Sequence, residues 1–347
     1  MLKLQNRAVG PGQPPYIIAE IGSNHNGDMA LCRELVVAAA ECGADAVKFQ
    51  SWSKSSLISE AEFRRNQSYA DTKRHFGSLR EMVEAYAFTP EQHVSIAAYC
   101  QEQNVHFMSS AFSNKEVDLL KEVGSAAIKI ASMDVTHELL LEHAASSGVP
   151  VILSTGMASL AEVARAAEIL QVGDSQAALL HCVSIYPPNM RDIHLNNIPM
   201  LRQAFGLPVG FSDHTRGVAV PLASVALGAC IIEKHFTLDK DMSGWDHWIS
   251  ADPPELRTLC EEAKNIYEAL GSAQRSVSEA ELKKRESFRR RAVVTRALKA
   301  GHKLSLEDLD FKRPGTGIHP NEYRYLLDRE LKRDLAADTE LEWNDLI

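Results

Sequence analysis

The chain alternates between short apolar or β-branched runs and longer segments whose apolar residues recur at helical spacing. This alternation is typical of parallel strands that are each joined to the next by a helix, rather than of a β-sandwich. Eight runs are therefore predicted to be strands. They are residues 16–22, 46–50, 105–112, 126–132, 149–156, 177–184, 207–213 and 230–236.

The segments between these runs predict helices, and several of them end in glycine, as helix C-termini often do. They include residues 29–43, 90–103, 114–124, 137–148, 160–171, 217–228 and 253–270. Eight strand and helix pairs make a (β/α)₈ TIM barrel the leading fold, with a doubly wound open sheet as the alternative. Polar residues at or just past the carboxyl ends of the strands favour the barrel, because barrel enzymes keep their active sites on that face.

The pattern changes towards the C-terminus. Residues 273–290 are rich in charge and poor in apolar residues, as expected of a linker or an exposed helix. Residues 291–347 contain short strand-like runs and turn signals, and they are too few to extend the barrel. We expect a catalytic barrel over residues 1–272, a linker over 273–290 and a small β-rich domain over 291–347.

The composition mainly excludes some classes of protein. The chain has 347 residues, of which 45% are hydrophobic, enough for one large domain and one small one. Its net charge of −9 offers no general attraction for nucleic acid. We expect a cytoplasmic protein without a membrane segment, because the sequence has no secretory leader and no apolar stretch of the ~20 residues that a span requires. The six cysteines show no Cys-x-x-Cys spacing and are expected to be reduced core thiols.

Two histidines lie at or just past the ends of neighbouring predicted strands, His214 in GFSDHT and His235 in EKHFTLDK. Both imidazoles can point into one barrel mouth, and imidazole binds Mn, Fe, Co and Zn. Either histidine alone would more often be a hydrogen-bonded structural group. With Glu233 and Asp246 nearby in the sequence, the pair predicts a shared metal site, and two histidines with oxygen ligands and water suit Mn²⁺ or Mg²⁺ better than a structural zinc.

Two lysines, Lys48 and Lys129, lie inside apolar strand runs, where an ammonium group is costly unless it is paired. One interpretation is an ion pair with a neighbouring carboxylate. Another is a cradle for a phosphate or carboxylate, built with serine hydroxyls on the same rim. A third is a Schiff-base lysine, for which Lys129 is the better candidate. The serines are Ser110, Ser132, Ser154 and Ser212.

A further carboxylate, Glu20, ends the first strand, and residues 24–27 after it have the composition of an ordinary turn. A carboxylate that faces the barrel mouth opposite a cation site is well placed for acid/base chemistry or for holding a sugar hydroxyl. Trp245 and Trp248 are expected to pack against the protein rather than to stack on a ligand.

Several motifs, in this order along the chain, give it a resemblance to the sialic acid (nonulosonic acid) synthase family. They are IAEIGSNHNGD, AVKFQ, AIKIAS, ILSTGM, LLHCVSIYPP, GFSDHT and EKHFTLDK, and FKRPGTGI is similar to the family's C-terminal antifreeze-like (SAF) domain. The resemblance covers nearly the whole chain. It implies the condensation of phosphoenolpyruvate with an N-acylated hexosamine, such as N-acetylmannosamine or a di-N-acetyl trideoxyhexose, to give a nonulosonic acid and phosphate.

The resemblance also implies roles for individual residues. A divalent metal, Mn²⁺ first with Mg²⁺ or Co²⁺ as alternatives, would be held by His214 and His235. Phosphoenolpyruvate would be bound by Lys48, Ser110, Lys129, Ser132, Ser154, Ser184 and Ser212. The sugar would be bound by Gln50, Asp134, Tyr186 and Arg313, and Glu20, Glu233 and Asp246 would assist catalysis. The family's arginine at the position of Arg313 reaches the other subunit's active site, which implies a domain-swapped homodimer.

Three positions depart from the family pattern. Ser184 stands where many members have asparagine, Asp134 where glutamate is common, and Trp245 where proline is frequent. Together with the basic and aromatic stretch 61–82, these departures leave the acceptor sugar and its phosphorylation open. Two other functions also stay open: a Schiff-base aldolase that uses Lys129, and a catalytically silent sugar-binding protein.

Overall fold

The computed structural model describes residues 1–65, 69–71, 74–76, 78–173, 175–313 and 315–347. It divides the chain into two compact units, Met1–Gly271 and Ser272–Ile347. The basic and aromatic stretch 61–82 falls partly on residues 66–68, 72–73 and 77, which lie outside the described residues.

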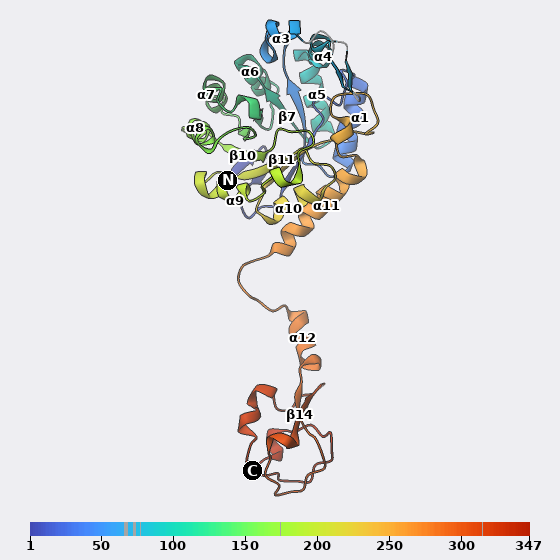
Figure 1. Cartoon of the computed structure of the whole chain (residues 1–347), viewed down its shortest axis with the longest axis vertical. Helices are drawn as coiled ribbons and strands as arrows, with labels where there is room; N and C mark the ends of the chain where they lie inside the picture. The colour runs from blue at the N-terminus through green and yellow to red at the C-terminus, as the bar shows by residue number, and fades with distance from the viewer. Residues whose placement is uncertain (66–68, 72–73, 77, 174, 314) are drawn as a thin grey trace. The chain divides into compact units, whose positions relative to one another are not determined.

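The first unit is a closed barrel of eight parallel strands (Figure 1). In order around the barrel the strands are β3 (Tyr16–Glu20), β4 (Ala46–Ser51), β7 (His106–Ala111), β8 (Ile128–Ile130), β9 (Val151–Ser154), β10 (Ala177–Cys182), β11 (Val209–Asp213) and β12 (Ile231–His235). The barrel closes where β12 pairs with β3, from Ile231 opposite Tyr16 to His235 opposite Glu20. Each strand coincides with a predicted run, so the (β/α)₈ prediction is confirmed and the open sheet is wrong.

A helix separates each strand from the next around the outside of the barrel (Figure 1). The helices are α1 (Met29–Glu41), α5 (Pro90–Glu102), α6 (Asn114–Glu122), α7 (Glu138–Ser146), α8 (Leu160–Leu170), α9 (Asn197–Phe205), α10 (Ala219–Ala226) and α11 (Pro253–Leu270). Capping residues in the sequence determine where several of these helices begin. Before α8, for example, Ser159 and Glu162 cap each other's backbone N–H groups in a capping box.

Alternate residues of each strand point into the barrel, and these inward residues are apolar at the amino ends and mostly polar at the carboxyl ends. The layer at the amino ends is apolar, and it contains Tyr16, Ile18, Ala46, Met108, Ile152, Ala178, Leu180 and Ile231. A hairpin of β1 (Leu2–Leu4) and β2 (Arg7–Val9) packs its apolar residues into the same cluster. The sequence pattern did not predict this hairpin. It supplies apolar contacts to the core beneath the polar layer.

The segment between β4 and α5 forms an apolar cluster of its own. It contains the short helices α2 (Lys54–Leu57) and α3 (Glu60–Arg65), strands β5 (Tyr69–Asp71) and β6 (Arg74–Phe76), and helix α4 (Leu79–Tyr86). The buried members of the cluster are Trp52, Phe63, Leu79, Met82, Val83, Tyr86 and Phe112. Because Trp52 directly follows β4 and Phe112 directly follows β7, the cluster lies at the carboxyl ends of those two strands.

The second unit begins with helix α12 (Glu279–Phe288), all of whose residues are exposed, within the segment predicted to be a linker. An antiparallel pair, β13 (Arg291–Val294) and β14 (Leu309–Lys312), then packs on a small core. This core contains Ala292, Val294, Leu298, Leu304, Leu309, Ile318, Leu326, Leu331, Leu335, Leu341 and Leu346. Within the described ranges of the whole chain, no helix combines the length and apolar character needed to cross a membrane.

One buried carboxylate, Asp308, organises the polar side of the second unit. Its Oδ1 accepts hydrogen bonds from Arg296 Nε and Nη2 at 3.1 and 2.8 Å. Its Oδ2 accepts from the Ser305 backbone N–H and hydroxyl at 3.0 and 2.9 Å, and lies 2.9 Å from His302 Nε2. Burial alone would raise the pKa of Asp308, but the contacts with His302, Ser305 and Arg296 lower it well below its usual range.

We predict that Asp308→Asn destabilises the second unit by about 2–3 kcal/mol, because it removes an acceptor of several charge-assisted hydrogen bonds. Since the folded-state pKa lies below the unfolded value of roughly 3.9, this stabilisation is complete above the unfolded pKa and is lost as the pH falls towards the folded one. Hydrogen exchange of the β13 and β14 amides in the full chain would measure both effects. Asp334→Asn, which removes an exposed partner of Lys299, is the matched control and should change little. Equal protection in both variants would contradict the assignment.

Candidate active site

A pocket of about 430 Å³ lies at the carboxyl ends of the barrel strands. It is lined by every residue that the sequence and the family resemblance assigned to the site except Asp134 and Arg313. The residues that line it are Glu20, Lys48, Gln50, Ser110, Lys129, Ser132, Ser154, Ser184, Tyr186, Ser212, His214, Glu233, His235 and Asp246. The strand period explains this convergence, because residues two apart on one strand, such as Glu233 and His235, face the same side.

The first buried ammonium group, that of Lys48, forms an ion pair with Glu20. Lys48 also donates a hydrogen bond to Ser110 Oγ at 3.1 Å, and Gln50 Nε2 donates to Glu20 Oε1 at 2.8 Å. Burial would lower the pKa of Lys48, but Glu20 and Glu233 outweigh it and raise that pKa. Burial also raises the pKa of Glu20, although Lys48 opposes the change. Lys48 therefore stays charged, and the carboxyl group beside it takes up a proton more readily than an ordinary glutamate does.

The second ammonium group, that of Lys129, has a different environment. Its Nζ donates to Ser154 Oγ at 2.6 Å and to the Ile130 carbonyl at 3.1 Å. Burial lowers the pKa of Lys129, with Glu233 opposing the shift. The pKa of Glu233 is itself lowered, since Lys129 and Lys48 outweigh the burial that would raise it. Neutral oxygens thus hold Lys129 directly, which leaves its charge available to an anion.

Two more serine hydroxyls pack beside the backbone of the STGM motif. The Gly156 N–H donates a hydrogen bond to Ser132 Oγ at 3.0 Å. A Cβ atom at position 156 would lie 2.3 Å from Ser184 Oγ and 2.9 Å from Ser132 Oγ. Only glycine fits this position, and its absent side chain lets both hydroxyls line the pocket.

The two histidines face each other across the pocket, with their ring centroids 5.5 Å apart. His214 Nδ1 lies 2.9 Å from the Val183 carbonyl, and with Nδ1 as the donor, Nε2 is the atom left to bind a ligand. His235 Nδ1 is buried without a hydrogen-bond partner, and Asp246 Oδ2 lies 3.7 Å away. Burial lowers the pKa of His235 well below its usual range, so this imidazole is neutral.

This donor set fits a divalent metal held by few protein ligands. Glu233 Oε2, like His235 Nδ1, is buried without a hydrogen-bond partner. Burial would lower the pKa of His214, but contacts with Cys182 and Val183 raise it, so a metal would have to displace a proton there. Over the described part of the chain, no cluster of three or more His, Cys, Asp or Glu side chains is arranged to hold a metal. Water or substrate would supply the remaining ligands, as in open catalytic sites.

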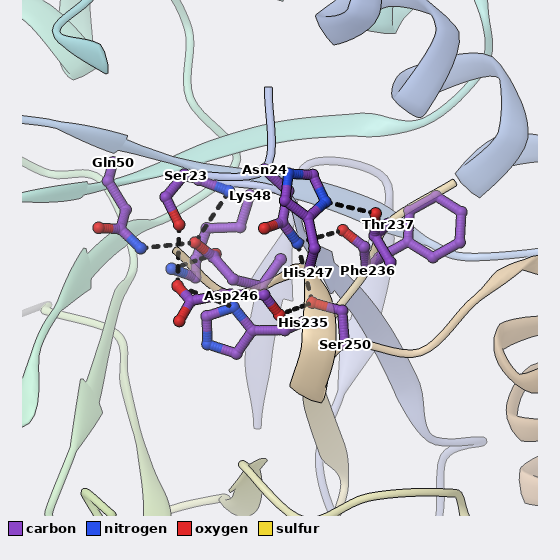
Figure 2. A network of polar contacts seen from close by, with 12 residues as sticks. Ser23, Asn24, Lys48, Gln50, His235, Phe236, Thr237, Asp246, His247 and Ser250 are labelled. Carbon is purple, nitrogen blue, oxygen red and sulfur yellow. Dashed lines mark hydrogen bonds and ion pairs between the residues drawn. The ribbon is translucent and has the colours of Figure 1, made fainter. Parts of the chain in front are cut away.

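A network of polar contacts joins the turn after β3 to the segment after β12, across the seam of the barrel (Figure 2). Ser23 Oγ donates to Asp246 Oδ2 at 2.8 Å. Asn24 Nδ2 donates to the Phe236 carbonyl and to Ser250 Oγ, both at 2.8 Å. The sequence pattern had marked residues 24–27 only as a turn, yet Asn24 is fully buried and ties the seam together.

A second buried ion pair is formed by two residues that do not line the pocket, Lys234 of β12 and Asp213, which directly precedes His214. Lys234 Nζ contacts Asp213 Oδ2 and the Thr215 carbonyl, both at 2.7 Å. Asp213 also accepts hydrogen bonds from the Thr215 N–H and hydroxyl at 2.9 and 3.1 Å. Both members of the ion pair are at most 1% exposed. These contacts hold the residues on either side of His214.

Several placements differ from the sequence-based expectations or add to them. Asp134 does not line the pocket, and its carboxylate lies 3.7 Å from His137. Arg313 belongs to the second unit, where it lies over the Phe288 ring at 5.0 Å. Cys182 was expected to be a core thiol only. It is buried and reduced, but it also lines the pocket beside His214.

The aromatic residues of the pocket also go beyond the sequence analysis. Tyr186 packs on His214 with ring centroids 4.0 Å apart. Trp245, expected only to pack, lines the pocket as well as contacting the apolar cluster, whereas Trp248 lies under the Arg216 guanidinium at 5.1 Å. Trp52, Met82 and Phe112 line the pocket too. Met82 ends the stretch 61–82 that the sequence analysis connected with the acceptor sugar, whereas no sequence signal identified Trp52 or Phe112 as pocket residues.

The fold and the pocket together define a (β/α)₈ barrel with a pocket of buried charged and hydroxyl side chains at the carboxyl ends of its strands, followed by a small β-rich domain. Residues 35–275 match the model of the NeuB family, and residues 289–347 match the model of the SAF domain. The chain belongs to the NeuB family, whose named members here are sialic, legionaminic and pseudaminic acid synthases, so the resemblance seen in the sequence is confirmed.

Individual relatives show how similar the chain is to members of the family. The chain is 39% identical to the N,N'-diacetyllegionaminic acid synthase of Legionella pneumophila, covering 97% of this chain and 96% of the relative. It is 32% identical to the pseudaminic acid synthase of Helicobacter pylori, covering 96% and 98%. The crystal structure of N-acetylneuraminic acid synthetase from Leptospira borgpetersenii in complex with citrate matches it with a TM-score of 0.73 at 35% identity, covering 83% of this chain and 96% of that one. The chain is thus a carbohydrate-biosynthetic synthase, and its relatives are named for different products.

We predict that Lys234→Met destabilises the barrel by roughly 3–5 kcal/mol, because it leaves the Asp213 carboxylate buried without its cation. Hydrogen exchange of the β11 and β12 amides in the full chain would show the loss. The double variant Asp213→Asn with Lys234→Met removes both charges and should recover most of the protection. A single variant as protected as the wild type would mean that the ion pair does not support this part of the barrel.

Proposed function

We propose that this protein condenses phosphoenolpyruvate with an N-acylated hexosamine to give a nonulosonic acid and phosphate, and that the reaction depends on a divalent metal. The observation that carries the proposal is the position of two buried ammonium groups and their serine hydroxyls next to a pair of facing histidines. This arrangement supports the proposal because it places groups suited to an anion and groups suited to a metal in one pocket of about 430 Å³.

Phosphoenolpyruvate carries a phosphate and a carboxylate on one small frame, and two lysines suit these two groups. Lys129, held only by neutral oxygens, can bind one anionic group with Ser154, while Lys48 and Ser110 bind the other. Ser132 and Ser184 add hydroxyl donors on the same rim, whereas the Ser212 hydroxyl donates to Glu233 Oε1 at 2.9 Å. Charge-assisted hydrogen bonds of this kind are stronger than neutral ones, and burial strengthens them further.

His214 and His235 would hold the metal, with Mn²⁺ our first choice and Mg²⁺ or Co²⁺ the alternatives. Such an ion, when bound, acts as a Lewis acid on the acceptor's aldehyde oxygen. Tyr186 packs against both imidazoles, at 4.0 and 5.9 Å between ring centroids, and so restricts their rotation. Asp246, oriented by Ser23, presents its carboxylate on the same side of the pocket.

The overall reaction joins C3 of the enolpyruvyl group to the aldehyde carbon of the open-chain sugar. Water adds to the enolpyruvyl C2, and phosphate leaves. The raised pKa of Glu20 suits it to hold a proton at a carboxyl oxygen for transfer to the sugar, while the lowered pKa of Glu233 keeps that group anionic between the lysines. Gln50 holds Glu20 in place through its 2.8 Å hydrogen bond.

One observation also favours a second reaction. Burial lowers the pKa of Lys129, which is what a Schiff-base lysine needs in order to attack the carbonyl of pyruvate. An aldolase of this kind would need no metal and no phosphoenolpyruvate. The intact pairs of histidines and lysines count against the remaining alternative, a sugar-binding protein without catalysis.

The decisive experiment measures phosphate release from phosphoenolpyruvate with Mn²⁺ and a panel of N-acetylmannosamine, its 6-phosphate and a 2,4-diacetamido-2,4,6-trideoxyhexose. We expect release that requires a sugar and that stops when EDTA removes the metal. A parallel reaction with pyruvate and borohydride should leave Lys129 unmodified. Borohydride trapping together with EDTA-resistant turnover would establish the aldolase instead, and no turnover by either route would leave the binding protein.

We also propose that the protein is a homodimer in which the second unit of one chain completes the pocket of the other. Counted from the sequence, residues 1–271 carry 21 basic and 32 acidic side chains, and residues 272–347 carry 16 basic and 14 acidic ones. The net charges, −11 and +2, are of opposite sign and favour association between units. Arg313 is exposed on the positive unit and is the side chain proposed to reach the partner's sugar.

Combining two impaired variants, assayed at a sugar concentration well below the KM of the Arg313→Ala variant, tests this exchange. Arg313→Ala should raise the KM for the sugar far more than that for phosphoenolpyruvate, and His235→Ala should abolish turnover. In a mixed dimer, the barrel of the Arg313→Ala chain keeps His235 and receives Arg313 from its partner, so one of the two pockets is complete. Co-expression should therefore restore roughly a quarter of wild-type activity for random pairing. Activity no higher than that of the separate variants would contradict the exchange.

A further inference from the structure

One side of the pocket is apolar. The opposite part, which we call the charged floor, is formed by the strand residues Glu20, Lys48, Lys129 and Glu233. Six side chains, which we call the apolar wall, line that side. They are Trp52, Leu57, Ile58, Met82, Phe112 and Trp245. Four of them come from the segment between β4 and α5, and the other two follow β7 and β12. The wall therefore belongs mainly to a segment outside the barrel, whereas the charged floor comes from the strands.

The apolar wall is backed by the cluster between β4 and α5, so it is held in place without a ligand. Trp52, Met82 and Phe112 are buried members of that cluster, and Leu57, Ile58 and Trp245 pack against it. The Trp52 indole N–H donates to the Val83 carbonyl at 3.0 Å, which fixes the orientation of the ring. The rings of Trp52 and Phe112 lie 6.1 Å apart between centroids. The exposed face of the wall is a preformed apolar surface.

The positive charges of the pocket are all at its floor. Among the described residues that line it, the only lysine or arginine side chains are those of Lys48 and Lys129. The proposed function assigns both to phosphoenolpyruvate. The other charged groups nearby include the carboxylates of Glu20, Glu233 and Asp246. On the side of the apolar wall, a second phosphate would meet an apolar surface and carboxylates without a described lysine or arginine of the first unit, which is an unfavourable environment for a dianion.

We infer that the acceptor sugar is unphosphorylated and presents methyl groups, from a deoxygenated carbon or from acyl substituents, to the apolar wall. This inference rests on the proposed function and narrows its acceptor. A phosphate in place of such a methyl group would be left unpaired against the wall. A hydroxyl would lose its hydrogen bonds to water there, while each added methyl group that the wall covers is worth roughly 10–200-fold in specificity.

Steady-state phosphate release in the presence of Mn²⁺ tests the inference with three acceptors. We expect kcat/KM to be highest for the 2,4-diacetamido-2,4,6-trideoxyhexose and at least about tenfold lower for N-acetylmannosamine. The value for N-acetylmannosamine 6-phosphate should be lowest. Turnover that is equal or fastest with the 6-phosphate would overturn the inference and leave the proposed function standing. No phosphate release with any acceptor would overturn both.

A positive charge placed on the apolar wall should shift the preference from the unphosphorylated trideoxyhexose towards the sugar 6-phosphate. Leu57 is half-buried and lines the pocket, so Leu57→Lys should raise kcat/KM for the 6-phosphate about tenfold or more and lower it for the trideoxyhexose. The KM for phosphoenolpyruvate should stay unchanged, because its site is on the floor. Leu139→Lys, at a residue of α7 that is 71% exposed, is the matched control. If Leu57→Lys and the control show the same preference, the wall does not contact this part of the acceptor.

Discussion

The burial of two lysine side chains inside the barrel is the constraint on which the rest of the site depends. An ammonium group in a low-dielectric interior is stable only where carboxylates and hydroxyls surround it. Lys48 meets this requirement with Glu20 and Ser110, and Lys129 meets it with Ser154 and a backbone carbonyl. Their side-chain partners come from neighbouring strands, so the charged floor exists only when these strands have paired. The apolar layer at the amino ends, which includes the first hairpin, excludes water from beneath this floor.

Successive side chains of a strand point to opposite sides of the barrel wall, so one strand can contribute residues both to the pocket and to the packing outside it. In β12, Glu233 and His235 point into the pocket, while Lys234 between them points outward and pairs with Asp213 of β11. The same alternation that presents a ligand therefore also places a buried ion pair one residue away. His235 is the last residue of β12 and His214 directly follows β11, so the ends of two paired strands position both side chains.

Sequence reasoning found the eight strands because their apolar and β-branched runs are local signals, and it found the lysines and histidines because they interrupt or end those runs. Other features depend on contacts that no local pattern encodes. Asn24 reaches residues more than 200 positions away at the seam, and its motif has the composition of a simple turn. The first hairpin was missed because three-residue strands give little periodicity. Cys182 has the sequence context of a core thiol, and only the closed barrel places it beside His214.

The pocket therefore has two parts with different structural origins. Its floor is made of strand residues whose positions are fixed by barrel closure, and changes there would disturb both catalysis and folding. Its apolar wall comes largely from the segment between β4 and α5, which carries its own small core and adds no strand to the barrel. Such a segment can change its surface without opening the barrel. Under the proposed function, the strands would carry the chemistry, whereas the inserted segment would contact the acceptor and set its choice.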